Sequence, residues 1–201
     1  PVLAQDIQPI SLKDVRLSIW PEYDDLAQLE YPSLLVILEG EIVSDNIPAT
    51  IRFLVPNDAV LYLAGSGPRD EYTGATPERK ASDITGWDEI SFELKTKYFV
   101  IEYYAPIIGQ PDRIIPFDFH TLHPVNGLKA EAQEPRRSKI FSVSPEGLIR
   151  SDDGGFRYHT YEYANVSPDA PLHFDINYSK ADLRPSLGSS AGTGLPITVI
   201  L

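Results

Sequence analysis

Apolar and polar residues alternate with a period of two along most of the chain. Ile90, Phe92 and Leu94 alternate with polar neighbours, and the stretch from Leu172 to Tyr178 repeats the pattern. Successive side chains of a strand point to opposite faces, so this pattern predicts strands with one buried and one solvated face. We therefore expect an antiparallel all-β fold in the form of a β-sandwich.

Prolines and glycines mark where these strands end. Pro48 and Pro56 bracket one apolar stretch, and proline cannot donate to a strand ladder. The Asp-Asp-Gly-Gly sequence at 152–155 predicts a hairpin turn, because these residues tolerate positive φ. In total the pattern predicts about eleven strands, a short acidic helical piece within 22–30, and a segment at 64–89 without a strong period. An irregular segment of that length is typical of a functional or mobile loop.

The two ends carry patterns of their own. Residues 2–5 are small or β-branched where a signal peptidase needs them, with cleavage after Ala4. Residues 185–196 are rich in glycine, serine and proline, and the apolar run 197–201 follows. This order predicts a flexible linker that leads to a membrane anchor. The alternative for the apolar run is a tail or a final edge strand.

These features predict three parts of the chain. Residues 1–10 are an N-terminal segment after signal cleavage, residues 11–180 are the β-sandwich, and residues 181–201 are a linker towards a membrane anchor. A split of the sandwich into two lobes is expected near 105–111, and a single sandwich is the alternative. We accordingly expect an extracytoplasmic protein, either secreted or tethered at the cell surface or in the periplasm.

Composition narrows the range of functions. The 201 residues are 42% apolar, enough for a packed core, and no cysteine is present for a disulfide, a thiolate metal site or a thiol nucleophile. The formal net charge is −12, from 29 acidic and 17 basic residues. Nucleic acid is therefore not an expected partner, because its binding depends on clustered lysine and arginine. An anionic membrane surface is disfavoured as well, so membrane contact is expected only through the C-terminal anchor.

The stretch from Tyr161 to Tyr178 resembles the end of immunoglobulin-like and fibronectin-type-III-like domains, in which an aromatic strand leads through a hydrophobic-x-Pro turn into an alternating strand. The matching residues are Val166, Pro168, Leu172, Phe174 and Ile176. The resemblance implies a sandwich used for binding, spacing or adhesion in an exported, membrane-tethered bacterial protein, with Tyr161 or Tyr163 as a tyrosine corner. It carries no catalytic residue, and a jelly-roll-like sandwich is the alternative.

The best metal candidates are Asp118, His120 and His123. Asp118 and His120 share one face of a predicted strand, and His123 lies just past its end. Zinc takes three or four such ligands, so His159 or His173 would have to complete the set in space. Histidines that lie at the surface or accept ordinary hydrogen bonds are the simpler interpretation.

Calcium and a serine nucleophile are weaker hypotheses. Asp24 with Asp25, or Asp152 with Asp153, could offer oxygens to calcium, but no calcium-loop spacing occurs and turn chemistry explains the second pair. Residues 188–192 match G-x-S-x-G, yet neither an acid nor a histidine follows, as a hydrolase would require. No cofactor is therefore expected, with calcium or zinc as alternatives.

Aromatic residues near predicted strand ends suggest a ligand platform. Trp20 is out of phase with the apolar positions of its strand, so it is expected to face outward beside Tyr23, while Tyr72 and Trp87 lie in or after the long irregular segment. Exposed tryptophan and tyrosine with nearby carboxylates can stack on sugars and bind their hydroxyls. The alternative is that these rings pack within the fold.

The sequence thus predicts a non-catalytic module for binding, adhesion or scaffolding at the cell envelope, with a protein or a glycan as partner. The first alternative is a carbohydrate-binding module that uses Trp20, Tyr23, Tyr72 and Trp87. The second is a hydrolase whose metal or carboxylate site is assembled in space, for which Glu22, Asp24 and Asp25 are examples of acidic candidates.

Overall fold

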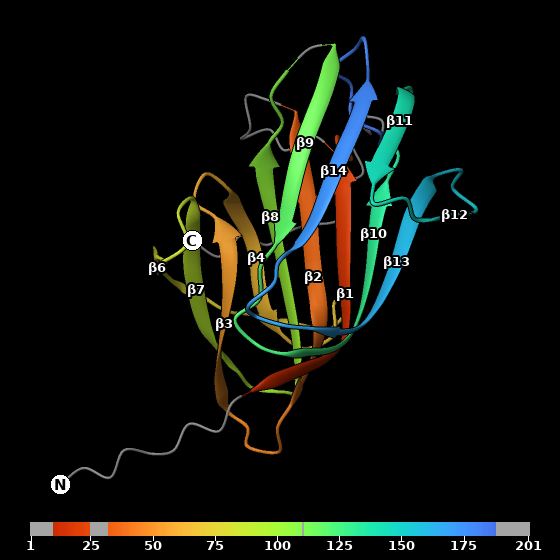
Figure 1. Cartoon of the computed structure of the whole chain (residues 1–201). Helices are drawn as coiled ribbons and strands as arrows, with labels where there is room; N and C mark the ends of the chain where they lie inside the picture. The colour runs from red at the N-terminus through yellow and green to blue at the C-terminus, as the bar shows by residue number, and fades with distance from the viewer. Residues whose placement is uncertain (1–9, 25–31, 110, 188–201) are drawn as a thin grey trace, which may run out of the picture.

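The fold consists of two layers of β-strands (Figure 1). A computed structural model describes residues 10–24, 32–109 and 111–187, and within them the chain forms fourteen strands and no helix. The all-β, sandwich-like fold expected from the alternating pattern is therefore confirmed.

The larger layer is one sheet of eight strands in the order β12-β13-β10-β1-β2-β8-β4-β5. Its strands are β1 (Ser11–Pro21), β2 (Ser33–Val43), β4 (Val60–Ser66), β5 (Thr73–Gly74), β8 (Tyr98–Pro106), β10 (Val125–Gln133), β12 (Leu148–Ser151) and β13 (Arg157–Val166). Neighbouring strands are antiparallel except β1 and β10, which are parallel from Leu12↔Val125 to Ile19↔Ala132. This pair departs from the purely antiparallel sheet that the sequence predicts.

Two sheets of three strands make the second layer, in the orders β11-β14-β9 and β3-β7-β6. Their strands are β3 (Ala49–Pro56), β6 (Glu78–Ala81), β7 (Trp87–Leu94), β9 (Asp112–Phe119), β11 (Lys139–Ser144) and β14 (Leu172–Ser179). Both small sheets lie on the same side of the large one (Figure 1). A single core cluster includes Leu17 of β1, Phe92 of β7 and Phe174 of β14, so all three sheets share one hydrophobic core.

The chain passes from one set of strands to the other through residues 105–111. The eight strands before this segment include β3, β6 and β7 of the second layer, and the six after it include β9, β11 and β14. The parallel β1–β10 pair joins the two sets within the large sheet. The core is continuous across this junction, because Val15 and Leu128, paired there, belong to the same cluster.

The segment 64–89 is more regular than its sequence suggests. It contains β5 and the fully exposed edge strand β6, which pairs with β7. An edge strand without a buried face has no reason to alternate, so the period of two is missing there. The predicted turn at 152–155 is present, and it connects the antiparallel strands β12 and β13.

Several predicted features fall outside the described residues. These are the signal-peptidase pattern at residues 2–5, most of the acidic piece 22–30, the serine motif at 188–192 and the apolar run 197–201. Among the residues that the structure does describe, no helix is long and apolar enough to cross a membrane.

A buried ionic cluster of Glu22, Arg113, Tyr178 and Lys180, here called the Glu22 cluster, closes one end of the sandwich. Arg113 Nε and the Tyr178 hydroxyl donate to the same Glu22 oxygen at 3.1 and 2.9 Å, and Lys180 Nζ donates to the other. The charged side chains are at most 1% exposed. Burial and the Glu22 carboxylate both raise the pKa of Tyr178, so its hydroxyl stays a donor.

The described residues after β14 are hydrogen-bonded to the body of the protein. Ser186 N donates to Glu22 O at 2.6 Å and Leu187 N donates to Tyr23 O at 2.7 Å. Arg137 Nη2 donates to the carbonyl oxygens of Arg184 and Pro185. This docked segment therefore ends beside Tyr23, close to the open face of the large sheet.

Candidate functional site

The large sheet has one covered face and one open face, and the candidate site lies on the open face. Along β1, Leu17 and Ile19 are buried in the core, while Arg16, Ser18 and Trp20 point to the other side. The strand register places Arg16 opposite Glu39 of β2 and Ser18 beside Glu131 of β10. Polar and charged side chains from three strands therefore meet there.

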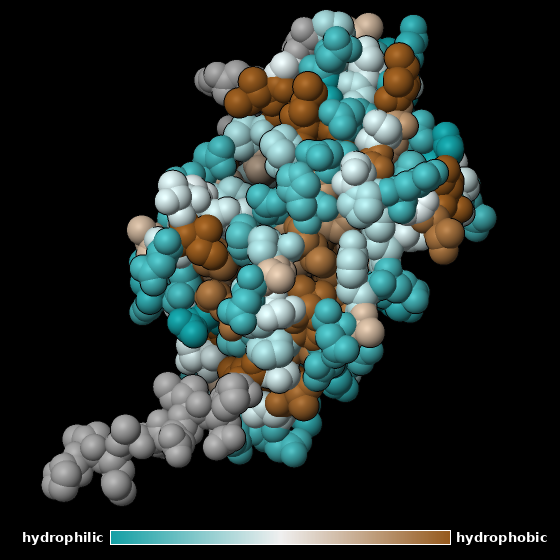
Figure 2. Space-filling view, in the orientation of Figure 1, coloured by the Kyte–Doolittle hydropathy of each residue, from teal (hydrophilic) through white to brown (hydrophobic). Residues whose placement is uncertain are grey.

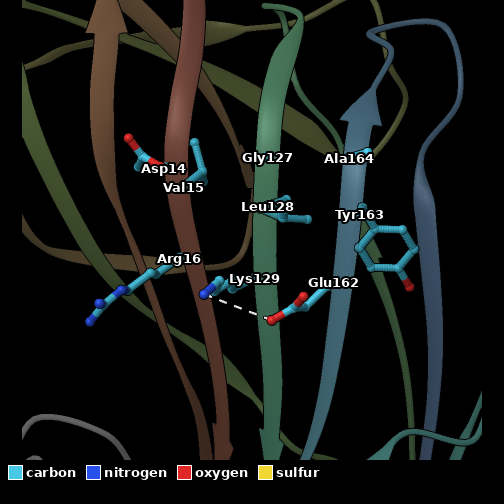
Figure 3. Close-up of a pocket in the computed structure, with 9 residues that line it drawn as sticks. All are labelled: Asp14, Val15, Arg16, Gly127, Leu128, Lys129, Glu162, Tyr163 and Ala164. Carbon is cyan, nitrogen blue, oxygen red and sulfur yellow. Dashed lines mark ion pairs between the residues drawn. The ribbon is translucent and has the colours of Figure 1, made fainter.

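A β-bulge shapes one end of this face. Lys13 pairs with Glu41 and Arg16 with Glu39, so β1 has one residue more than β2 between these pairs. Asp14, within the bulge, has a φ of 50°. On β10, Gly127 has a φ of 88°, and no atom lies within 4 Å of where its Cβ would be. The bulge and the absent side chain leave a hollow of about 490 Å³ between β1, β10 and β13 (Figure 3).

Glu131 is the polar centre at the other end. Its Oε1 accepts hydrogen bonds from Trp20 Nε1 at 3.1 Å and from the Ser18 hydroxyl at 3.3 Å, and Arg150 donates to its Oε2. Three strands, β1, β10 and β12, contribute these groups. The carboxylate thus fixes the indole edge and the guanidinium in place on the sheet surface.

Aromatic rings support this polar centre. The ring of Trp20 lies 4.6 Å from that of Tyr23 and 6.5 Å from that of Tyr158. The Arg150 guanidinium lies 4.0 Å above the Tyr158 ring, and Arg69 lies 5.9 Å from the Trp20 ring. Burial raises the pKa of Tyr158 to about 12. Trp20 and Tyr23 also pack against a small buried cluster of Leu35, Ile37 and Tyr104 on this face, so both rings are partly structural.

Three adjoining hollows run along the open face. Besides the hollow at the bulge, one of about 440 Å³ lies over β1, β10 and β13, and one of about 370 Å³ lies towards β8. Arg16 lines all three. The central hollow is bounded by the charged residues Arg16, Glu39, Arg69, Lys129, Glu131, Arg150 and Glu162 and by Ser18, Trp20 and Thr160. We call the three hollows together the open-face groove.

The four aromatic residues predicted to bind a ligand do not share one surface. Trp20 and Tyr23 are in contact beside the open-face groove. Tyr72 is exposed in the loop before β5. Trp87 begins β7 in the second layer, where its ring lies 4.7 Å from that of His120. Only the first two therefore belong to the candidate site.

The three residues predicted to bind a metal have separate partners. His173 Nδ1 lies 2.6 Å from Asp118 Oδ1 across the β9–β14 pair. His120 contacts Trp87, and His123 is buried beside Phe53, where burial lowers its pKa. Within the described residues, no group of three histidine, aspartate or glutamate side chains is arranged to hold a metal ion.

The other acidic candidates also have structural partners. Asp152 accepts a hydrogen bond from the Phe156 backbone N–H at 2.9 Å and one from the Tyr158 hydroxyl at 2.8 Å, so it organises the hairpin turn. The Phe156 N–H holds the pKa of Asp152 below its usual value. Glu22 is enclosed in the Glu22 cluster, and Asp24 accepts a hydrogen bond from the Tyr104 hydroxyl at 3.1 Å.

A smaller apolar hollow lies in the second layer. It has a volume of about 290 Å³ and is lined by residues that include Trp87, Ile108 and Ile114. Figure 2 looks onto this layer and shows exposed apolar side chains in separate spots, divided by polar ones. Scattered apolar residues of this kind are ordinary on protein surfaces, so the open-face groove is the better candidate.

Sequence reasoning missed most of the groove. The alternation along β1 could have placed Arg16 and Ser18 beside Trp20 on one face. The positions of Glu131 and Arg150 depend on the parallel β1–β10 pair and on the place of β12 at the sheet edge, and neither leaves a local signal.

The fold and the site together define an all-β, sandwich-like protein with a polar groove on its open face. No protein-family model and no curated protein matches the chain. Among solved structures, it is similar to part of a candidate protease of Parabacteroides distasonis, at 12% identity and a TM-score of 0.42, over 84% of this chain and 40% of that one. It is also similar to the acetylcholine-binding protein AChBP of Bulinus truncatus, at 9% identity and a TM-score of 0.20, over 84% and 87% of the two chains.

Proposed function

We propose that the protein is a non-catalytic binding module that holds a glycan in the open-face groove. The observation that carries the proposal is the meeting of three hollows at Arg16, on a face where hydrogen-bonding groups from six strands converge. Binding pockets typically combine a fitted concave surface with a few polar groups that fix the ligand.

The chemistry of the groove suits a ligand rich in hydroxyl groups. The Ser18 and Thr160 hydroxyl oxygens, whose protons are donated within the protein, can accept hydrogen bonds from a ligand. Arg16 and the remaining N–H groups of Arg150 can donate them, and Trp20 supplies apolar contact. Asp14 and Trp20 are six residues apart on β1, which corresponds to roughly 20 Å of strand. A groove of that length fits several consecutive sugar units better than a single small molecule.

A hydrolytic role has less support from the same residues. Both oxygens of Glu131 are occupied by donors from its own chain, and Glu22 is sealed inside its cluster. A glycosidase needs two carboxyl groups that face each other across a substrate. The carboxylates of the groove instead pair with cations, which is the arrangement of a binding surface.

The immunoglobulin-like relationship and the location at the cell envelope are parts of the same proposal. The Tyr161 hydroxyl donates to the Pro145 carbonyl oxygen at 2.9 Å, a side-chain to backbone bond of the kind a tyrosine corner makes. The envelope location rests on the residue patterns at 2–5 and 185–201. Fractionation of the producing cells tests it, and recovery of the protein in the cytosol would contradict it.

A thermal-shift screen against neutral and acidic oligosaccharides tests the binding function. A ligand at about 100 times its dissociation constant adds roughly 2.7 kcal/mol, which for a chain of this size raises the melting temperature by roughly 5–11 °C. We expect Glu131→Gln to abolish the shift. The matched control is Glu93→Gln, which removes the same charge on β7 in the other layer.

The result that would overturn the proposal is equally specific. If no oligosaccharide shifts the melting temperature, or if Glu131→Gln keeps the full ligand-induced shift of the unmodified protein and of the Glu93→Gln control, the groove is not a glycan site. Circular dichroism of both variants before the screen ensures that each is folded.

A further inference from the structure

Three cations on the open face are only loosely paired with their acidic neighbours. Arg16 Nη1 lies 3.8 Å from Glu39 Oε1, and Arg69 Nη2 lies 3.8 Å from Glu102 Oε2. Lys129 Nζ lies 3.7 Å from Glu162 Oε1, the pair marked in Figure 3. These separations exceed hydrogen-bond distance, so the donors of all three side chains can bond to another acceptor.

The arginines reach further into solvent than the carboxylates beside them. The Arg16 side chain is 71% exposed against 27% for Glu39, and the Arg69 side chain is 42% exposed against 12% for Glu102. Burial also raises the pKa of Glu102. A ligand that enters the groove therefore meets guanidinium groups first, with the carboxylates on the floor beneath them.

The charge of this region contrasts with that of the whole chain. Around the central hollow stand four cations, Arg16, Arg69, Lys129 and Arg150, and three carboxylates, Glu39, Glu131 and Glu162. The chain as a whole carries 29 acidic and 17 basic residues. The three hollows together are lined by the same four cations and by six carboxylates, which are Asp14, Glu39, Glu41, Asp70, Glu131 and Glu162, so cations are in excess in the central hollow alone. On so acidic a protein, the central hollow is therefore the part of the groove that favours anionic groups.

We propose that the glycan bound by the open-face groove is an acidic one, whose carboxylate or sulfate groups bind to Arg16, Arg69 and Lys129. This inference rests on the proposed glycan-binding function. Guanidinium groups present a planar fork of donors that matches carboxylate and sulfate oxygens, and lysine adds a point charge. All three cations line the central hollow, and Arg16 has the central role because it also borders the two hollows beside it.

Matched pairs of short oligosaccharides test the proposal by titration calorimetry. One pair is dextran and dextran sulfate, and the other is methyl-esterified and free oligogalacturonate. We expect the charged member of at least one pair to bind at least about tenfold more tightly than the neutral member, with an affinity that falls as salt rises. Which pair responds distinguishes sulfate from carboxylate.

Substitutions of the two arginines test whether the charged oligosaccharide binds to them. Arg16→Gln and Arg69→Gln are each expected to weaken binding of the charged oligosaccharide about tenfold. The control is Arg52→Gln on β3 of the other layer, which removes an arginine that is 51% exposed and 3.2 Å from Glu89. It is expected to leave the affinity within about twofold.

Three results would overturn the inference. If neutral oligosaccharides bind as tightly as charged ones and their binding depends on Glu131, the groove is a glycan site without a preference for charge. The proposed function would then stand without this extension. If Arg16→Gln and Arg52→Gln lose equal affinity for the charged oligosaccharide, the preference for charged sugars comes from the overall charge of the protein and not from the groove. Absence of binding to every oligosaccharide would overturn both the inference and the proposed function.

Discussion

Replacement of Glu22 by glutamine tests how the Glu22 cluster stabilises the fold. The carboxylate is the only anion in contact distance of both Arg113 and Lys180 among the described residues, and both cationic side chains have no solvent exposure. Glutamine keeps the size of the side chain and one acceptor oxygen but removes the charge. Two cations would then be buried with Asp182, 3.9 Å from Lys180, as the nearest remaining carboxylate.

The expected loss of stability is large. Removal of one partner from a buried ion pair costs about 3–5 kcal/mol, because the remaining charge stays buried without compensation. Unfolding free energies of domains are about 5–15 kcal/mol in total. For a chain of this length the melting temperature should fall by roughly 6–20 °C.

Lys180→Met provides the informative comparison. It leaves one carboxylate with one guanidinium, so the charge of the cluster becomes balanced, and only the hydrogen bonds of the ammonium group are lost. We expect a smaller loss than in Glu22→Gln, about 1–3 kcal/mol. In the double variant only Arg113 of the cluster remains charged. The stability lost by the double variant should therefore be smaller than the sum of the losses in the two single variants.

Urea unfolding followed by tryptophan fluorescence measures these free energies. The slope of the unfolding free energy against urea concentration should be the same in all variants. Glu162→Gln is the matched control, since its carboxylate is 79% exposed and its pairing with Lys129 should contribute less than about 1 kcal/mol. A loss in Glu22→Gln no larger than that in Glu162→Gln, or additive losses in the double variant, would refute the reasoning.

Four further predictions concern local features, each measured by urea unfolding. Burial lowers the pKa of His123, so below the ordinary histidine pKa of about 6.5 the unfolded chain binds a proton more readily than the folded one, and stability falls on acidification. His123→Phe should reduce the loss of unfolding free energy between about pH 7.5 and 5.5. An unchanged loss would contradict this. The hydrogen bond that His173 donates to the Asp118 carboxylate raises the pKa of His173, so the protonated imidazole stabilises the fold below about pH 6.5, and this contribution disappears above the folded-state pKa. His173→Asn should therefore steepen the loss of stability on acidification. Asp152→Ala removes the acceptor of a backbone N–H and a tyrosine hydroxyl at the β12–β13 turn and should cost about 1–3 kcal/mol, whereas an unchanged midpoint would show that the turn does not need it. Gly40→Ala would place a Cβ 2.9 Å from a core phenylalanine ring and should cost about 1–3 kcal/mol, while Gly74→Ala, with open space around the new atom, should not; equal effects would argue against overpacking.

The sequence was informative wherever one face of a strand is buried and the other is wet. The alternation from Leu172 to Tyr178 corresponds to β14, and the out-of-phase position of Trp20 corresponds to its place on the open face. Both features are local, because the faces of a strand follow from its own side chains. The edge strand β6 escaped the same reasoning because all of its residues are exposed.

Features that depend on distant pairing could not be inferred. Arg113 and Lys180 contact Glu22 across 91 and 158 positions of sequence, and each looks like an ordinary surface residue in its local context. The groove has the same origin, since Glu131 reaches Trp20 only because β10 lies parallel to β1. Long-range register, rather than local propensity, therefore decides both the ionic cluster and the candidate site.

The architecture explains why binding chemistry would gather on the open face. The second layer covers one side of the eight-stranded sheet; the other side has a small buried cluster of Leu35, Ile37 and Tyr104 over β2 and β8, and polar side chains over β1, β10 and β13 that remain in water. Cross-strand pairs such as Arg16 with Glu39 keep this part polar, and their loose geometry keeps the cations available. At physiological salt, charges beyond about 8 Å are largely screened. An anionic ligand in the groove would consequently be attracted mainly by the guanidinium groups within contact distance. The acidic rest of the surface would disfavour the ligand outside the groove without preventing binding inside it.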